Sequence, residues 1–118
     1  GAVIQPAVLS NVKKGMRISH EELFGPAIGI TKTSNIEEAI NLANDTRFGL
    51  SASVFTEDIN KAMRFANEVD SGNLHINFGT AWRAENMPYG GLKNSGIGKE
   101  GPKYAINEMT ETKMVIIH

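Results

Sequence analysis

Between residues 27 and 77 the apolar positions change period in a way that predicts alternating strands and helices. The short β-branched run at 27–31 predicts a strand. A helix is expected to follow, because Ser34 with Glu37 three residues later matches a capping box. Residues Asp45-Thr46 and Gly49 are expected to end it. Its buried stripe is expected at helical spacing, on Ile36, Ala39, Ile40 and Ala43.

A second strand and helix are predicted directly afterwards. Leu50, Ala52 and Val54 alternate with small polar residues, as in a strand. Thr56 or Asp58 is expected to cap the next helix, and Gly72 to follow its end as a left-handed cap. The apolar face of this helix is predicted on Ile59, Ala62, Met63 and Ala66. With a further strand at 74–77, the pattern predicts an α/β fold with a parallel βαβαβ unit and right-handed crossovers.

Beyond Asn77 the pattern changes character. Residues 78–102 are rich in glycine, asparagine and charge without a sustained period, and a loop of that length in a compact domain indicates a functional role. The apolar run at 114–117 predicts a closing strand outside the alternating unit. Such a strand needs a partner edge.

Composition narrows the class of protein. The chain has 118 residues, 41% of them apolar and 21% charged, which suits one compact soluble domain. A net charge of -1 favours neither nucleic acid nor a membrane surface as a partner. No membrane span or signal peptide is recognisable, so a cytoplasmic location is expected. The start at Gly1-Ala2-Val3, without methionine, fits a fragment or a cleaved chain.

The residues alone show no catalytic centre. The chain has no cysteine, which excludes disulfides, thiolate metal sites and a cysteine nucleophile. His20-Glu21-Glu22 lacks the H-E-x-x-H spacing of a metal site, and no G-x-S-x-G elbow occurs. Gly96 to Gly101 matches G-x-G-x-x-G, but a polar loop precedes it and little chain follows. Flexible-loop glycines are therefore the preferred interpretation.

Two segments carry a family resemblance. E-E-L-F-G-P at 21–26 and M-P-Y-G-G-L-K-N-S-G at 87–96 resemble the E-E-x-F-G-P and P-F-G-G-x-K-x-S-G motifs of the aldehyde dehydrogenase superfamily. Segments 38–44, 48–56 and 108–113 resemble the same family in the same order. The resemblance covers nearly the whole chain and is nearest to members acting on glyceraldehyde 3-phosphate (non-phosphorylating) or lactaldehyde.

The resemblance implies a fragment of an NAD(P)-dependent aldehyde dehydrogenase. In this family the nucleophilic cysteine, the general-base glutamate and the cofactor domain precede E-E-x-F-G-P, so a chain without them should be inactive alone. In the intact enzyme a cysteine attacks the aldehyde, hydride passes to NAD or NADP, and water releases the acid. Residues 1–103 would be the second half of the catalytic domain, with a substrate loop at 78–102. Residues 104–118 would form a C-terminal helix and the strand that joins a homo-oligomer. The alternative is a stand-alone, non-catalytic binding or assembly module.

The resemblance also implies roles for four residues, none of them catalytic or metal-binding. Glu22 matches the glutamate that binds the ribose hydroxyls beside the nicotinamide, and Phe24 the aromatic residue near its ring. Tyr89 stands where the family usually has phenylalanine in the aldehyde tunnel. Arg83 is expected to bind an anionic or hydroxylated aldehyde. The competing interpretations are a solvated acid for Glu22, a core aromatic for Phe24 and, for Arg83, a surface side chain that is paired with Glu85 or solvated.

Overall fold

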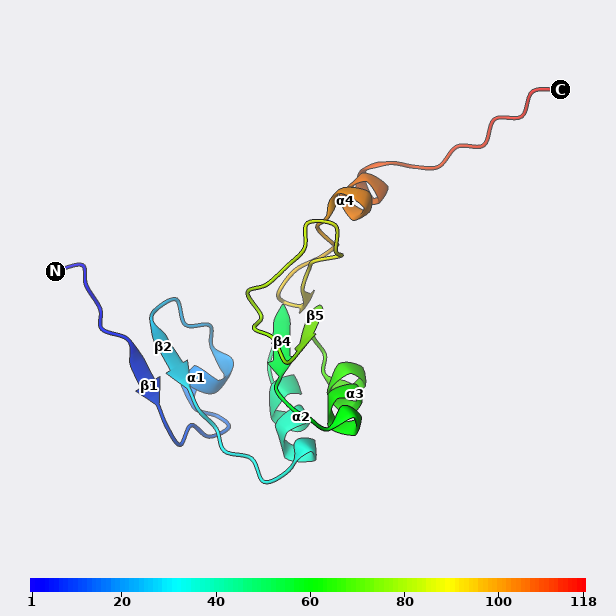
Figure 1. The fold of residues 1–118 in the computed structure, drawn as a ribbon. Coiled ribbons are helices and arrows are strands. Elements are labelled where there is room, and N and C mark those ends of the chain that lie inside the picture. Colours follow the sequence, from blue (N-terminus) through cyan, green and yellow to red (C-terminus); the bar gives the residue numbers. More distant parts are fainter.

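A computed structural model describes residues 1–118, with ten short elements joined by long connections (Figure 1). In chain order they are β1 (Ala7–Leu9), α1 (Arg17–His20), β2 (Ala27–Gly29), α2 (Ile36–Asn44), β3 (Phe48–Gly49), β4 (Ser51–Val54), α3 (Ile59–Glu68), β5 (Asn73–Ile76), β6 (Leu92–Lys93) and α4 (Pro102–Met109).

The strands form three separate two-stranded sheets. β4 and β5 pair in parallel across α3, in register from Ser51 with Asn73 to Val54 with Ile76. This confirms the α/β class and its parallel strands. β2 pairs in parallel with β1 instead of with β4, and β3 pairs antiparallel with β6. One continuous βαβαβ sheet is therefore not formed within this chain, because β2 and β3 have other partners.

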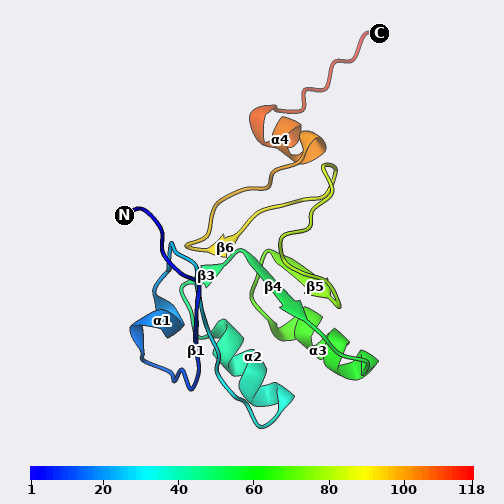
Figure 2. The same ribbon diagram turned by 60° about the vertical axis from the view of Figure 1, so that its left-hand side comes forward.

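The core lies between the β4–β5 sheet and helices α2 and α3, which cover one face of it (Figure 2). Ile40, Phe65 and Val69 are its buried residues, and half-buried Ala52, Val54 and Leu74 pack against them from the strands. The predicted face of α3 was partly wrong. Ala62 is buried as expected, but Phe65 and Val69 replace Ile59 and Met63, which are exposed.

The N-cap of α3 agrees with the sequence prediction, whereas the N-cap of α2 lies one residue later than predicted. Of the two predicted caps for α3, Thr56 and Asp58, the structure uses Asp58, whose carboxylate accepts from the backbone N–H groups of Asn60 and Lys61. In α2 the cap is Asn35 rather than Ser34: its Oδ1 accepts from the Glu38 N–H at 2.9 Å. The Glu38 carboxylate then accepts from the Ser34 N–H at 2.7 Å. The capping box thus uses Glu38 and not Glu37, since Asn35 has the extended backbone that a cap requires.

Gly72 is needed for close packing and not for a left-handed cap. It does not have a positive φ, and α3 ends at Glu68 with Val69 as its cap. A Cβ placed on Gly72 would overlap with the Gly90 carbonyl oxygen. The expected left-handed cap was wrong, and glycine at this position lets β5 approach the long loop.

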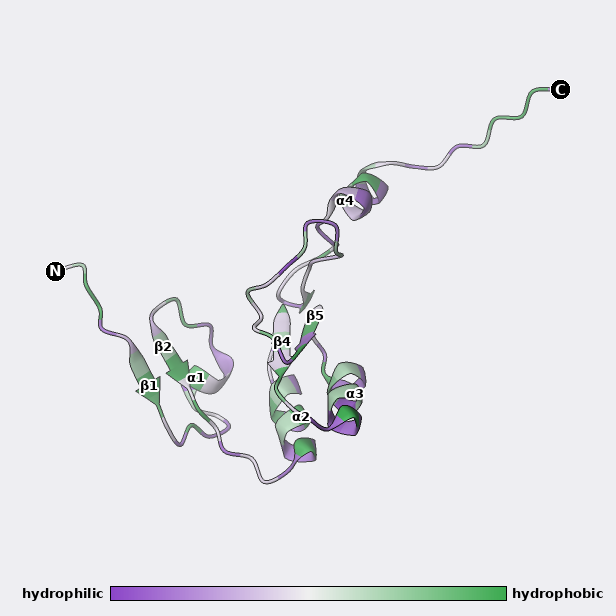
Figure 3. Ribbon diagram, in the orientation of Figure 1, coloured by the Kyte–Doolittle hydropathy of each residue, from purple (hydrophilic) through white to green (hydrophobic).

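The molecule is extended rather than compact. Its radius of gyration is 18.6 Å and its longest dimension 71 Å, whereas a compact chain of this length has a radius of about 13 to 14 Å. Only 9 of 118 residues are buried. α4 and the segment after it project away from the remaining elements, and the last residues are apolar and unpaired (Figure 3). Much of the apolar surface therefore remains uncovered within this chain.

Candidate functional site

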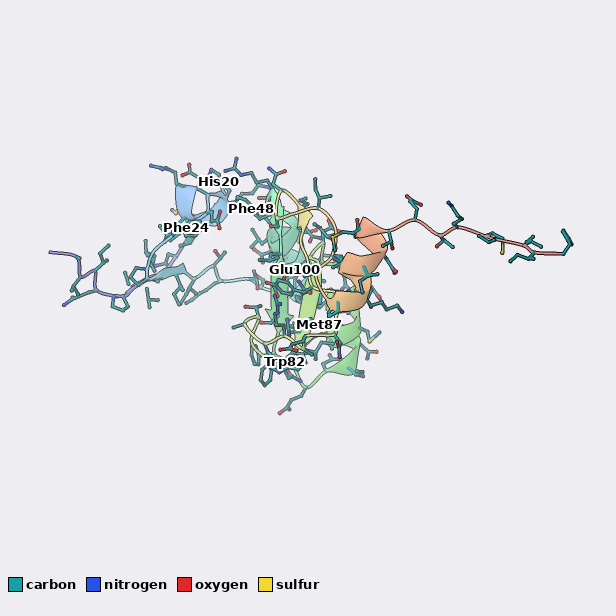
Figure 4. All side chains as sticks on the ribbon, turned by 90° about the horizontal axis from the view of Figure 1, so that it is seen from above. His20, Phe24, Phe48, Trp82, Met87 and Glu100 are labelled. Carbon is teal, nitrogen blue, oxygen red and sulfur yellow. The ribbon has the colours of Figure 1, made fainter.

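An open groove of about 710 Å³ separates α1 from the end of α2. One wall is the end of α1 with the two acids that follow it, and the other is the five-residue segment 44–48. His20 and Phe48 come from opposite walls and lie close together in Figure 4. Except for Phe48 the lining residues are polar or charged, which suits a polar ligand better than an apolar one.

The two adjacent acids in this groove differ in what they bind. Arg17 donates from Nε and Nη2 to the Glu21 carboxylate at 2.8 to 3.1 Å. These hydrogen bonds lower the pKa of Glu21 below its ordinary value. Glu22 has no hydrogen bond or ion pair, and it also lines a second, smaller pocket beside β3 and β4. Of the two acids, Glu22, the predicted one, is therefore the carboxylate free to accept hydrogen bonds from a ligand.

Phe24 is not part of the core of this chain. Its side chain is 92% exposed, and it projects from the loop between α1 and β2 (Figure 4). Within this chain the core-aromatic interpretation is therefore not supported for this residue. An exposed flat apolar ring, two residues along the chain from Glu22, is an available contact surface for a planar ligand.

The glycine-rich loop fixes the second wall of the groove. Lys93 donates from Nζ to the carbonyl oxygens of Asn44 and Thr46 at 3.1 and 3.2 Å, closing the C-terminal end of α2. The Asn94 N–H donates to the Arg47 carbonyl oxygen, and the Gly49 N–H donates to Ser95 Oγ, both at 2.9 Å. Sequence reasoning missed these anchoring roles. The only available signal was the lysine and serine of the motif itself.

Arg83 and Tyr89, both assigned to the substrate site by the resemblance, lie against each other, and Glu100 joins them. The Arg83 guanidinium carbon lies 4.9 Å from the centre of the Tyr89 ring, and Nη1 donates to Glu100 at 3.0 Å. Tyr89 and Glu100 exchange two backbone hydrogen bonds. The ion pair with Glu85 was therefore wrong, because the partner of Arg83 is Glu100. Since both charged side chains are about half exposed or more, this pair is open to exchange with a solvent anion.

A small aromatic cluster adjoins Arg83. The Trp82 ring meets His75 and Phe78 edge-on, with centroids 6.4 and 6.2 Å apart. His75 is buried and its Nε2 has no hydrogen-bond partner. In Figure 4 Met87 is seen between Trp82 and Glu100, and all three are separated from His20 and Phe24. No hydrogen bond, ion pair or ring contact joins Glu22 and Phe24 to Arg83 and Tyr89.

The glycines at 96, 98 and 101 all have positive φ. α4 follows Gly101 directly, starting two residues before the C-terminal helix that the family resemblance implied, but the strand before the glycines is the two-residue antiparallel β6. That arrangement differs from the parallel unit of a dinucleotide fingerprint. No group of three histidine, aspartate or glutamate side chains is placed to hold a metal ion. No helix has the length and apolar character needed to cross a membrane.

Comparison with protein families matches residues 1–115 to the aldehyde dehydrogenase family. A lactaldehyde dehydrogenase of Methanococcus vannielii is 50% identical over 99% of this chain and 25% of its own length. A 3-sulfolactaldehyde dehydrogenase of Priestia aryabhattai is 46% identical over the whole chain and 25% of its own length. The chain thus spans about a quarter of the length of the curated relatives it matches.

Solved structures give the same picture. A glyceraldehyde-3-phosphate dehydrogenase of Methanocaldococcus jannaschii, complexed with NADP, superimposes with a TM-score of 0.86 and 44% identity over 93% of this chain and 24% of that chain. A betaine aldehyde dehydrogenase of Staphylococcus aureus, in complex with NAD+, superimposes with a TM-score of 0.80 and 42% identity over 86% of this chain and 20% of that chain.

Proposed function

The chain belongs to the aldehyde dehydrogenase family, and on this basis we propose that it forms part of an NAD(P)-dependent enzyme that oxidises an aldehyde to a carboxylic acid. Relatives of this similarity are named for that reaction, and solved neighbours hold NAD+ or NADP. The alternative of a stand-alone binding module is disfavoured, because a radius of gyration of 18.6 Å with nine buried residues does not describe a self-sufficient domain.

The observation that carries the proposal is the unpaired Glu22 carboxylate in the polar groove, with the exposed Phe24 ring two residues away. Glu22 would accept hydrogen bonds from the two ribose hydroxyls beside the nicotinamide, and Phe24 would pack near the ring. Lys93 and Ser95 hold the opposite wall in place. When bound, the cofactor supplies a hydride acceptor, while these side chains bind and orient it.

The aldehyde would bind along the loop that carries Arg83 and Tyr89. Arg83 would contact an anionic or hydroxylated end of the aldehyde, since guanidinium forms bidentate bonds with phosphate, sulfonate and carboxylate groups. The names of three relatives, for lactaldehyde, 3-sulfolactaldehyde and glyceraldehyde 3-phosphate, support this substrate class. Tyr89 lies under the guanidinium and would line the tunnel with its ring.

The C-terminal segment would pair with a second copy of the protein. Residues Met114 to Ile117 are 71 to 91% exposed and have no partner strand here. Four successive apolar residues in an extended, unpaired segment are suited to sheet pairing. The homo-oligomer and the cytoplasmic location both stay predictions from the sequence.

Proline scanning of the full-length protein tests this segment. Successive N–H groups of a strand point to opposite sides, so either Val115→Pro or Ile116→Pro should remove a hydrogen bond to the partner strand. We expect one of the two variants to shift the molar mass from light scattering towards the monomer. Val115→Thr keeps the N–H and should leave the mass unchanged. An unchanged mass in both proline variants would exclude the segment from assembly.

Turnover by the full-length protein tests the proposed function. Incubation with NAD or NADP and each of lactaldehyde, glyceraldehyde 3-phosphate and propanal should produce reduced nicotinamide, followed by its absorbance. The 118-residue chain alone should produce none, because it contains no thiol to attack the aldehyde. A full-length protein that reduces neither cofactor with any aldehyde would contradict the proposal.

A further inference from the structure

Two side chains from different parts of the chain donate to one carbonyl oxygen. Asn73, the first residue of β5, donates from Nδ2 to the Gly90 oxygen at 3.2 Å, and Lys99 donates from Nζ to the same oxygen at 3.2 Å. Asn73 is only 6% exposed, and its Nδ2 also donates to the Leu50 oxygen at 2.9 Å. The Gly90 peptide is therefore held from β5 and from the far end of the same loop.

Packing around this carbonyl leaves little freedom. Gly72 approaches the Gly90 oxygen so closely that a Cβ at position 72 would overlap with it. On the other side, a Cβ on Gly90 would lie 2.6 Å from the Gly98 oxygen. Neither neighbour is a flexible side-chain end, so the peptide is held by its neighbours as well as by its two donors.

Gly90 directly follows Tyr89, whose ring lies under Arg83. Tyr89 also exchanges backbone hydrogen bonds with Glu100, the residue after Lys99 and the ion-pair partner of Arg83. The position of the Gly90 carbonyl therefore sets where Tyr89 and Arg83 lie relative to β5. Displacement of reacting or binding groups by about 1 Å is enough to lower rates markedly.

We propose that Asn73 and Lys99 are positioning residues for the aldehyde site, acting together through the Gly90 carbonyl to hold Tyr89 and Arg83. This inference rests on the proposed function, since it assigns the Arg83–Tyr89 loop to aldehyde binding. Neither residue needs to contact the substrate in this role, since each acts through the Gly90 carbonyl. Their shared acceptor has a direct consequence: loss of one donor leaves the other in place, whereas loss of both leaves the half-buried carbonyl without a side-chain donor.

A double-mutant cycle in the full-length enzyme tests the shared acceptor. Asn73→Leu and Lys99→Met should each lower kcat/KM for glyceraldehyde 3-phosphate by about threefold, and the double variant by about a hundredfold. If the double variant loses more activity than the product of the two single losses, the excess measures the coupling through Gly90. The Asn73–Leu50 hydrogen bond is lost whenever Asn73 is replaced, with or without Lys99, so it cancels from the cycle. The loss should appear mainly in the aldehyde KM, while the cofactor KM stays within about twofold of the unmodified enzyme.

Conservative replacement provides the control. Lys99→Arg keeps a cationic donor. Combined with Asn73→Leu, it should therefore lower kcat/KM no further than Asn73→Leu does alone. If Asn73→Leu does not fold, Asn73→Ala enters the same cycle in its place. Independent effects, or equal changes in both KM values, would overturn the positioning role. An unmodified enzyme that oxidises no aldehyde would instead contradict the proposed function, so the two failures are distinguishable.

Discussion

Replacing Arg83 by leucine in the full-length enzyme is expected to lower kcat/KM for glyceraldehyde 3-phosphate by about a hundredfold. The guanidinium would bind the phosphate through charged hydrogen bonds, and leucine offers none. Propanal has no group for Arg83 to bind, so its kcat/KM should stay within about threefold. Selectivity between the two aldehydes, measured from initial rates, is the quantity that the substitution changes.

The exposed pair with Glu100 makes this exchange feasible. Arg83 is already matched to a carboxylate at 3.0 Å, and exposed ion pairs of this kind contribute little net free energy. An anionic aldehyde therefore has only a weakly held competitor to displace. The Tyr89 ring beneath the guanidinium keeps Arg83 oriented while its partner changes.

Arg47 offers a matched control for this prediction. It also lies against an aromatic ring, 5.1 Å from the centre of Phe48, but it belongs to the wall of the groove. Arg47→Leu should change kcat/KM for the two aldehydes by the same factor. If Arg83→Leu lowered kcat/KM for both aldehydes equally, Arg83 would not contact the substrate and would be a surface residue.

Glu22→Gln in the full-length enzyme is expected to slow hydride transfer by about a hundredfold. The amide keeps the shape of the side chain but replaces one acceptor oxygen by a donor, so the ribose loses its fixed position. The remaining contacts of the cofactor should limit the change in its affinity to about threefold or less. Single-turnover formation of reduced nicotinamide measures the first quantity, and equilibrium titration of the cofactor measures the second.

The neighbouring acid is the control for Glu22. Glu21 has the same side chain and lines the same groove, but Arg17 occupies its carboxylate. Glu21→Gln should lose that exposed ion pair and leave the hydride-transfer rate nearly unchanged. Similar rate losses in both variants would indicate a general disturbance of the loop and contradict a specific role for Glu22.

Local chemistry made part of the fold predictable. Asp58 caps α3 as expected, because an aspartate before a helical stripe satisfies the first N–H groups wherever the chain folds. The slip from Ser34 to Asn35 arose because both side chains can cap a helix, and only the preceding loop decides which has the required geometry. β1 was missed because three exposed residues show no alternation, and its partner β2 lies twenty residues later.

Contacts between residues far apart in sequence limited prediction of the site. The competing interpretation of Arg83 named its sequence neighbour Glu85 as ion-pair partner, but the turn at 79–82 and the Tyr89–Glu100 pairing bring Glu100 to it instead. Lys93 and Asn73 likewise act on carbonyls 47 and 17 residues away. The motif resemblance identified the loop. Sequence periodicity, however, cannot indicate which backbone carbonyl oxygens these side chains bind, because the acceptors are far away in sequence.

A crystal structure of the full-length protein with NAD or NADP bound tests the central claim most directly. The account predicts both Glu22 carboxylate oxygens within hydrogen-bond distance, about 2.5 to 3.2 Å, of the hydroxyls on the ribose that carries the nicotinamide. It also predicts the Phe24 ring packed near the nicotinamide. A bound cofactor whose ribose hydroxyls bond to other groups, with Glu22 left in solvent, would contradict it.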